Sequence, residues 1–186
     1  MSILSCLILT LVGILIFIVY NSVVIGKFGV PSSLSASFYL WNGVNKNLGY
    51  IFTGMMFAMA FCLMPGWLEI TAVITPWSHY LTVLPFLAAA SIAFVGAAPA
   101  FRDCKIENKV HMVSAACAAV FALLWCCVVC YQIAWIIVPL SLIVVWATAF
   151  ITKTHKTAAT YWWEMVAFLA TFVTIITECI ILMQIN

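Results

Sequence analysis

Long apolar stretches separated by short polar segments run through the whole chain. Six of these stretches are long enough to cross a bilayer, whose hydrocarbon core needs about 20 apolar residues in a helix. Within each stretch apolar residues are continuous and do not alternate with polar ones, so a membrane β-barrel is not indicated. The pattern predicts an all-α integral membrane bundle of six transmembrane helices, in one domain over residues 1–186.

Helix-breaking segments set the expected bounds of these spans. Segments such as GKFGVPSS, MPGWLE and APAFRDCKIENK combine Gly or Pro with polar residues between two apolar runs. The helices are therefore predicted at residues 3–26, 47–64, 81–100, 110–131, 134–151 and 160–185. Trp67, Trp135 and Trp163 fall near the expected helix ends, where amphipathic rings are typical of the headgroup level.

The composition agrees with a lipid environment. Hydrophobic residues make up 67% of the 186 residues and charged residues 6%, against about a quarter charged in a soluble domain. Membrane lipids are therefore expected partners, and a net charge of +2 without a basic cluster predicts no nucleic-acid partner. The eight cysteines lie mainly inside apolar spans, as buried thiols do, and indicate no disulfide framework. The sequence does not predict an oligomeric state.

Basic residues are confined to alternate loops. All seven lysines and arginines fall in the first, third and fifth loops: Lys27, Lys46, Arg102, Lys105, Lys109, Lys153 and Lys156. Because cytoplasmic loops carry an excess of Lys and Arg, these three loops are predicted to be cytoplasmic and both termini outside. The expected location is a bacterial inner membrane.

Small residues recur at helical spacing in the third and fourth spans. Ser114, Ala118 and Ala122 form one row in the fourth span, and a matching row in the third contains Ala89 and Ala93. Small residues allow helix backbones to approach closely in lipid. These two spans are predicted to form the tightest pair.

A polar stripe follows one face of the last span. Glu164, Thr171, Thr174 and Glu178 are spaced by seven, three and four residues, which aligns them on a helix. A charge at the bilayer centre costs roughly 3 kcal/mol, so the stripe should face the bundle interior or be protonated. Two interpretations of Glu178 remain open: a neutral or snorkelling group, or part of a polar cavity for a proton, ion or substrate.

A serine-rich segment, VPSSLSASFY, separates the first two spans. Its hydroxyls, on a short re-entrant or interfacial segment, are expected to satisfy backbone groups near the membrane surface. A catalytic alternative uses Ser35 or Ser37 as nucleophile, His111 as base and Asp103 to orient the histidine. His111 begins the fourth span, where an interfacial histidine beside a charged loop is the alternative.

The sequence does not favour a metal site or a redox-active thiol pair. His79 is expected on the opposite side of the membrane from His111 and His155, so no three-histidine site forms and no metal or other cofactor is predicted. The C-x-x-C of Cys127 and Cys130 lies near a helix C-terminus, where the helix dipole opposes a reactive thiolate.

Several segments carry a resemblance to known proteins. SLSASFY, LGYIFTGMMFAMAFCL, FLAAASIAFVGAAPAF and KVHMVSAACAAVFA resemble a group of small bacterial inner-membrane proteins with an S-x-S-A-x-Y-Y loop and an H-x-x-S-A helix start. More distantly, the chain is similar to FRAG/DRAM-type six-helix membrane proteins. The resemblance implies six helices and groups Ser35, Ser37, Tyr39 and His111 at the cytoplasmic side, but implies no activity.

Three functions are compatible with these features. The favoured one is binding or passage of a lipid or small solute at a polar site inside the bundle, because a polar stripe is present and G-x-S-x-G, H-E-x-x-H and P-loop motifs are absent. A lipid-active hydrolase that uses the Ser, His and Asp residues is the second. A structural or assembly subunit is the third. An enzyme is therefore not the favoured interpretation.

Overall fold

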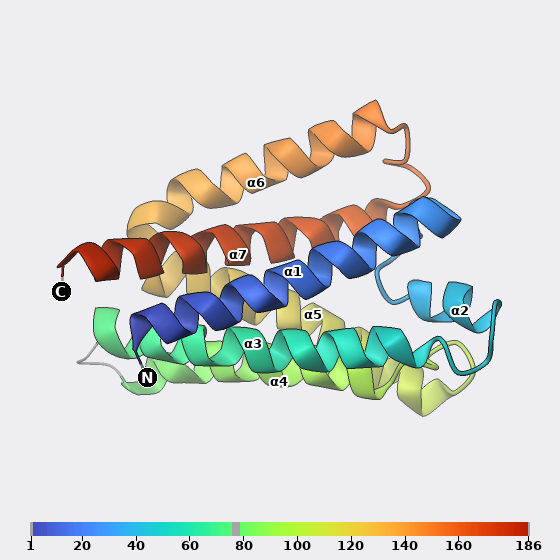
Figure 1. Cartoon of the computed structure of the whole chain (residues 1–186), viewed down its shortest axis with the longest axis horizontal. Coiled ribbons are helices and arrows are strands. Elements are labelled where there is room, and N and C mark those ends of the chain that lie inside the picture. The colour runs from blue at the N-terminus through green and yellow to red at the C-terminus, as the bar shows by residue number, and fades with distance from the viewer. Residues whose placement is uncertain (1, 76–78, 186) are drawn as a thin grey trace.

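The structure, a computed structural model, describes residues 2–75 and 79–185 as a bundle of helices (Figure 1). Within these ranges six helices are long and apolar enough to cross a membrane, as predicted, and no strand occurs. The helices are α1 (Ile3–Phe28), α2 (Ser37–Asn42), α3 (Tyr50–Ile74), η1 (His79–Thr82), α4 (Val83–Ala97), α5 (Lys105–Val129), α6 (Tyr131–Ile151) and α7 (Ala159–Ile185). The short α2 and the single 3-10 turn η1 lie in connections between the spans.

The second membrane helix, α3, runs well past its predicted end. The prediction placed its end at residue 64, but the helix continues through Pro65 to Ile74, so that prediction is wrong. A backbone in lipid must keep its hydrogen bonds within the helix, and neighbouring helices compensate for an internal proline. Gly66 allows α1 to approach here, because a Cβ atom at this position would lie 3.1 Å from Thr10 Oγ1.

Other helix ends differ from the prediction by a few residues. The helix α5 begins at Lys105 rather than at residue 110, so its first turn is polar. Only Cys130 separates α5 from α6, so residues 132–133, which were predicted to lie between the two helices, belong to α6. A helix can continue through a few polar or turn-forming residues, because in lipid the backbone has no better hydrogen-bond partner than the helix itself.

The packing places α7 at the centre and α6 at the edge. The helix α7 contacts α1, α3, α5 and α6, whereas α6 packs mainly on α7. The most extensively packed pair is α4 with α5, which confirms the prediction from their small residues. In Figure 1, α6 lies apart from the α3–α4 layer, with α7 and α1 between them.

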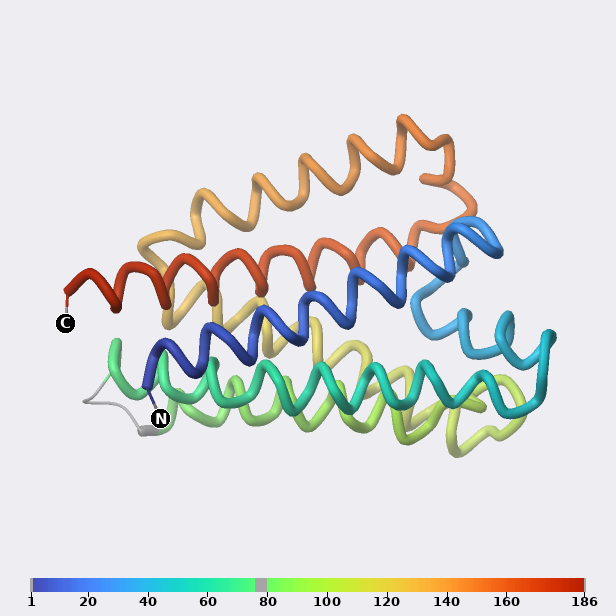
Figure 2. Tube along the Cα trace, in the orientation of Figure 1, coloured from blue at the N-terminus to red at the C-terminus, as the bar shows by residue number. Residues whose placement is uncertain are grey.

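Charge is distributed unequally between the two ends of the bundle. The helix α1 begins and α7 ends at one end of the bundle (Figure 2). The opposite end contains α2, the end of α1 and the start of α7, together with all seven lysines and arginines. The serine segment lies at this basic end.

Candidate functional site

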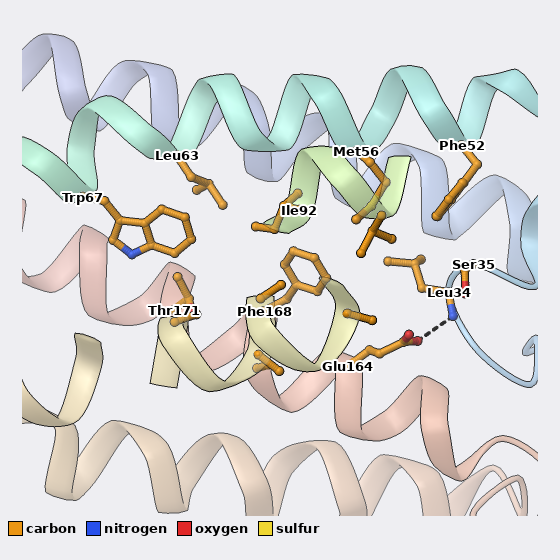
Figure 3. A pocket seen from close by; sticks show the side chains of 16 residues that line it. Leu34, Ser35, Phe52, Met56, Leu63, Trp67, Ile92, Glu164, Phe168 and Thr171 are labelled. Atoms are coloured by element: carbon orange, nitrogen blue, oxygen red, sulfur yellow. Dashed lines mark hydrogen bonds between the residues drawn. The ribbon is translucent and has the colours of Figure 1, made fainter. Parts of the chain in front are cut away.

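A cavity of ≈ 60 Å³ lies between α3, α4, α5, α7 and the serine segment (Figure 3). It is lined by Leu34, Ser35, Phe52, Met56, Leu63, Trp67, Ile92, Val95, Ala115, Ala118, Ala119, Ala122, Glu164, Ala167, Phe168 and Thr171. Its α3 wall extends from Phe52 to Trp67, which corresponds to roughly 22 Å along a helix axis. A small volume over that length makes the cavity long and narrow.

The α5 wall of this cavity consists of methyl groups. Four alanines, Ala115, Ala118, Ala119 and Ala122, face it. Larger side chains at these positions would fill the space between α5 and α7. The small residues that bring α4 and α5 together therefore also leave room beside α5.

Polar atoms are concentrated at the two ends of the cavity. Glu164 and Ser35 lie at one end, and Trp67 and Thr171 lie at the other (Figure 3). Trp67 Nε1 and Thr171 Oγ1 are buried and have no hydrogen-bond partner within the described part of the chain. A buried donor without a partner costs about 1–3 kcal/mol, so a ligand atom that pairs with either group would gain binding energy.

Glu164 joins the cavity to the serine segment. Its Oε2 accepts a hydrogen bond from the Leu34 backbone N–H at 2.6 Å. The Tyr161 N–H donates to Ser32 O at 3.3 Å, so the start of α7 holds the segment at two points. Leu34 and Ser35 consequently close this end of the cavity.

The serine hydroxyls satisfy backbone and neighbouring polar groups, as predicted. Ser37 Oγ donates to Leu34 O at 2.5 Å and lies 2.5 Å from Tyr20 Oη, which therefore donates to it. Ser33 Oγ accepts from the Ala36 N–H at 3.1 Å, and Ser35 Oγ lies 3.2 Å from Ser33 Oγ. These bonds hold the turn that leads into α2, which the sequence did not reveal as a helix.

His111 and Tyr39 belong to a different cluster at the same end. The buried His111 ring donates from Nδ1 to Ala98 O at 3.0 Å and stacks on Phe101 with ring centroids 4.4 Å apart. The Tyr39 ring also contacts Phe101, edge to face, with ring centroids 5.4 Å apart. Its hydroxyl accepts the Arg102 N–H at 2.7 Å. Burial is the main cause that raises the Tyr39 pKa above its usual range.

The four candidate catalytic residues therefore do not act as one group in this structure. The hydrogen bonds of Ser35, Ser37 and His111 go to other partners, and Asp103 is exposed. Phe101 packs against both Tyr39 and His111, whereas the Ser37 hydroxyl bonds with Tyr20 of α1. The arrangement provides a packed helix end rather than a nucleophile beside its base.

The polar stripe of α7 faces the bundle interior along its length, as predicted. Thr171, Thr174 and Glu178 are buried. Of the stripe residues, only Glu164 and Thr171 line the cavity. Thr174 and Glu178 lie beyond it, toward the C-terminal end of α7, and Glu178 lies beside the Cys130 thiol. The stripe therefore divides into a cavity-lining part and a helix-packing part.

Trp67 was predicted to lie in an interfacial belt, and that prediction is wrong. Its side chain is fully buried, because α3 continues beyond Pro65 and carries Trp67 into the bundle. Nearby, Trp125 Nε1 donates to Thr71 Oγ1 at 2.8 Å, and Thr71 Oγ1 donates to Trp67 O at 2.7 Å. Once α3 is extended, the spacing of Leu63 and Trp67 shows that both occupy one helix face.

The structure gives no sign of a metal centre in the described ranges, where no group of three or more His, Cys, Asp or Glu side chains converges. All eight cysteines are free. The side chain of His79 lies outside the described part of the structure. Cys126 and Cys130 are buried and Cys127 is exposed.

Comparison with known proteins identifies no relative. No family model matches the chain, and neither a curated protein nor a solved structure matches it. The resemblance to small bacterial membrane proteins and to FRAG/DRAM-type proteins stays a prediction from the sequence. Function must therefore be inferred from the site itself.

Proposed function

We propose that the protein binds a single-chain membrane amphiphile in the cavity between α3, α4, α5 and α7. The observation that carries the proposal is the cavity's shape and chemistry: it is narrow, largely apolar, and has Glu164 at one end. A linear alkyl chain has the smallest cross-section, so it would enter such a space with less displacement of the lining side chains than a compact solute of the same size. The interpretation favoured from the sequence was a lipid or small solute at a polar site; this proposal keeps the lipid-like ligand but places it in a largely apolar cavity.

The chemistry of Glu164 favours a particular kind of headgroup. An ionised carboxylate only accepts hydrogen bonds, and a protonated one retains an acceptor oxygen. A phosphate or carboxylate headgroup would meet like charge in a medium of low dielectric constant. The favoured ligand therefore has a hydroxyl, amide or ammonium group, with its tail directed toward Trp67.

Thermal unfolding of the purified protein with three matched probes tests this proposal. Dodecylamine and dodecanol should raise the melting temperature more than dodecanoate does, because their headgroups donate to Glu164. A ligand at 100 times its Kd stabilises the folded state by about 2.7 kcal/mol. Glu164→Gln should reduce the difference between the melting-temperature increases that dodecylamine and dodecanoate cause.

A cavity-filling variant provides the decisive comparison. Ala119→Phe places a ring in the cavity and should abolish stabilisation by all three probes. Ala116→Phe is the matched control, because Ala116 is an exposed residue of α5 that does not line the cavity. If the probes stabilised the Ala119→Phe and Ala116→Phe variants equally, the proposal would be contradicted.

We also propose that the basic end of the bundle faces the cytoplasm of a bacterial inner membrane. The seven lysines and arginines at that end support this orientation. In intact cells that express a Cys127→Ser background, a membrane-impermeant maleimide should fail to label the exposed Cys104. It should label a cysteine introduced by Ser2→Cys once Cys104→Ser is added to that background. The reverse labelling pattern would overturn the orientation.

The other two functions have no comparable support. The hydrolase would need His111 to bond with Ser35 or Ser37, and these residues have other partners. A purely structural subunit would not need the cavity. The amphiphile-binding proposal accounts for the cavity and for the position of Glu164.

A further inference from the structure

A second hollow lies on the outer surface of the bundle, where α1, α2 and α3 meet. This surface groove has a volume of ≈ 680 Å³ and is lined by Leu15, Ile16, Val19, Tyr20, Val23, Trp41, Ile51, Gly54 and Met55. It shares no lining residue with the internal cavity. Leu15, Val19, Val23 and Ile51 are exposed in the protein, so the groove opens toward lipid.

The length of the surface groove corresponds to one leaflet of a bilayer. Along α1 it extends from Leu15 to Val23, roughly 12 Å of helix. Half of the hydrocarbon core of a bilayer is about 15 Å deep. An acyl chain that lies in the groove would therefore remain within one leaflet.

A cation lies at the end of this groove. Lys27 occurs in the last turn of α1, one turn beyond Val23. Its Nζ lies 5.0 Å from the ring centroid of Trp41 and 5.4 Å from that of Phe28. The two rings hold the ammonium group beside the groove at the basic end of the bundle, where a lipid phosphate would lie.

Trp41 contributes a second feature at this position. Its side chain lines the groove, and its buried Nε1 lies beside Tyr20, another residue of the groove. The apolar groove thus ends at a positive charge held over an indole ring.

We propose that the surface groove binds an anionic phospholipid, with one acyl chain along α1 and α3 and its phosphate paired with Lys27. The positive charge selects an anionic headgroup over a zwitterionic one. This site is independent of the amphiphile proposed for the internal cavity, whose carboxylate favours a donor headgroup. Different variants therefore test the two sites.

Native mass spectrometry of the full chain in detergent can measure this preference. Dioleoyl phosphatidylglycerol and dioleoyl phosphatidylcholine would be titrated separately at matched concentrations. The wild-type protein should bind the anionic lipid more tightly. Lys27→Gln should weaken that binding roughly fivefold, with little change for the zwitterionic lipid. Lys46→Gln, which removes an exposed lysine from the connection between α2 and α3, should leave both affinities unchanged.

A glycine in the groove allows the acyl chain to be tested separately. A Cβ atom on Gly54 would meet nothing within 4 Å, and Gly54 lines the groove, so Gly54→Leu places a side chain in groove space and should weaken binding of both lipids. Gly26→Leu is the matched control, because Gly26 is equally open and lies off the groove. Equal lipid binding by the two glycine variants would overturn the proposal. A wild-type headgroup preference in Lys27→Gln would overturn it as well.

Discussion

The helices α6 and α7 are consecutive, pack against each other and are equally hydrophobic, yet they occupy different environments. In the most apolar stretch of α7, 56% of the residues are buried, against 28% in α6. The helix α7 contacts four other membrane helices and lines the cavity, whereas α6 packs mainly on α7. Most of the surface of α6 faces lipid.

This difference shows what hydropathy measures in a membrane protein. Lipid tails are as apolar as leucine, so a high hydropathy distinguishes a membrane segment from a soluble one but not an inner helix from an outer one. The polar residues make that distinction. Thr171, Thr174 and Glu178 of α7 are buried, whereas the exposed Thr148 of α6 donates to its own backbone at Val144 O.

The largest expected effect comes from the same truncation in the two helices. Ile175 of α7 is fully buried, and Ile143 of α6 is 64% exposed. Ile175→Ala should lower the free energy of unfolding by about 2–4 kcal/mol, because it leaves a cavity against α3. Ile143→Ala should lower it by less than about 0.5 kcal/mol, because lipid replaces the lost contacts. Reversible unfolding in mixed micelles measures both values, and similar losses would contradict the assignment of α6 to the periphery.

A pair of threonines sharpens the comparison within the bundle interior. Thr71 of α3 accepts from Trp125 and donates to Trp67 O, whereas the Thr174 hydroxyl of α7 has only the weakly bonding Cys126 thiol beside it among the described residues. Thr71→Val should cost about 1–3 kcal/mol, since it leaves the Trp125 N–H unpaired. Thr174→Val should be neutral or stabilising. A larger loss for Thr174→Val in the same unfolding assay would show that its hydroxyl has a stronger partner.

The smallest effect concerns one hydroxyl in each helix. Tyr161 of α7 is 2% exposed and donates to Asn21 Oδ1 at 3.1 Å, whereas Tyr131 of α6 is 54% exposed. Tyr161→Phe should lower stability by about 1 kcal/mol, and Tyr131→Phe should leave it unchanged. A measurable loss for Tyr131→Phe alone would argue that α6 has a partner at its Tyr131 end.

Much of the fold could be predicted because lipid imposes simple constraints. The six apolar runs and the one-sided basic loops were sufficient to predict the number of spans. The rows of small residues were sufficient to predict that α4 and α5 pack together. The end of α3 could not be predicted, because a proline ends helices in water but is tolerated within a membrane bundle. That error also placed Trp67 at the interface instead of in the core.

The candidate site could be predicted only in part. The spacing of Glu164, Thr171, Thr174 and Glu178 showed that they share a face, and this face is the interior one. Which of them line a cavity depends on tertiary packing, because the space arises between the alanines of α5 and the side chains of α3 and α7. The bond between Glu164 and the Leu34 N–H joins residues 130 positions apart, and no local pattern contains it.

We propose that the interior beside α7, rather than the lipid-facing surface of α6, holds a linear amphiphile. A crystal structure with ω-bromododecylamine can locate such a ligand, because the anomalous signal marks the bromine atom. We expect a bromine peak near Trp67 and Thr171, with the amine beside Glu164. Bromine peaks confined to the outer surface of the bundle, with no density in the cavity, would contradict it.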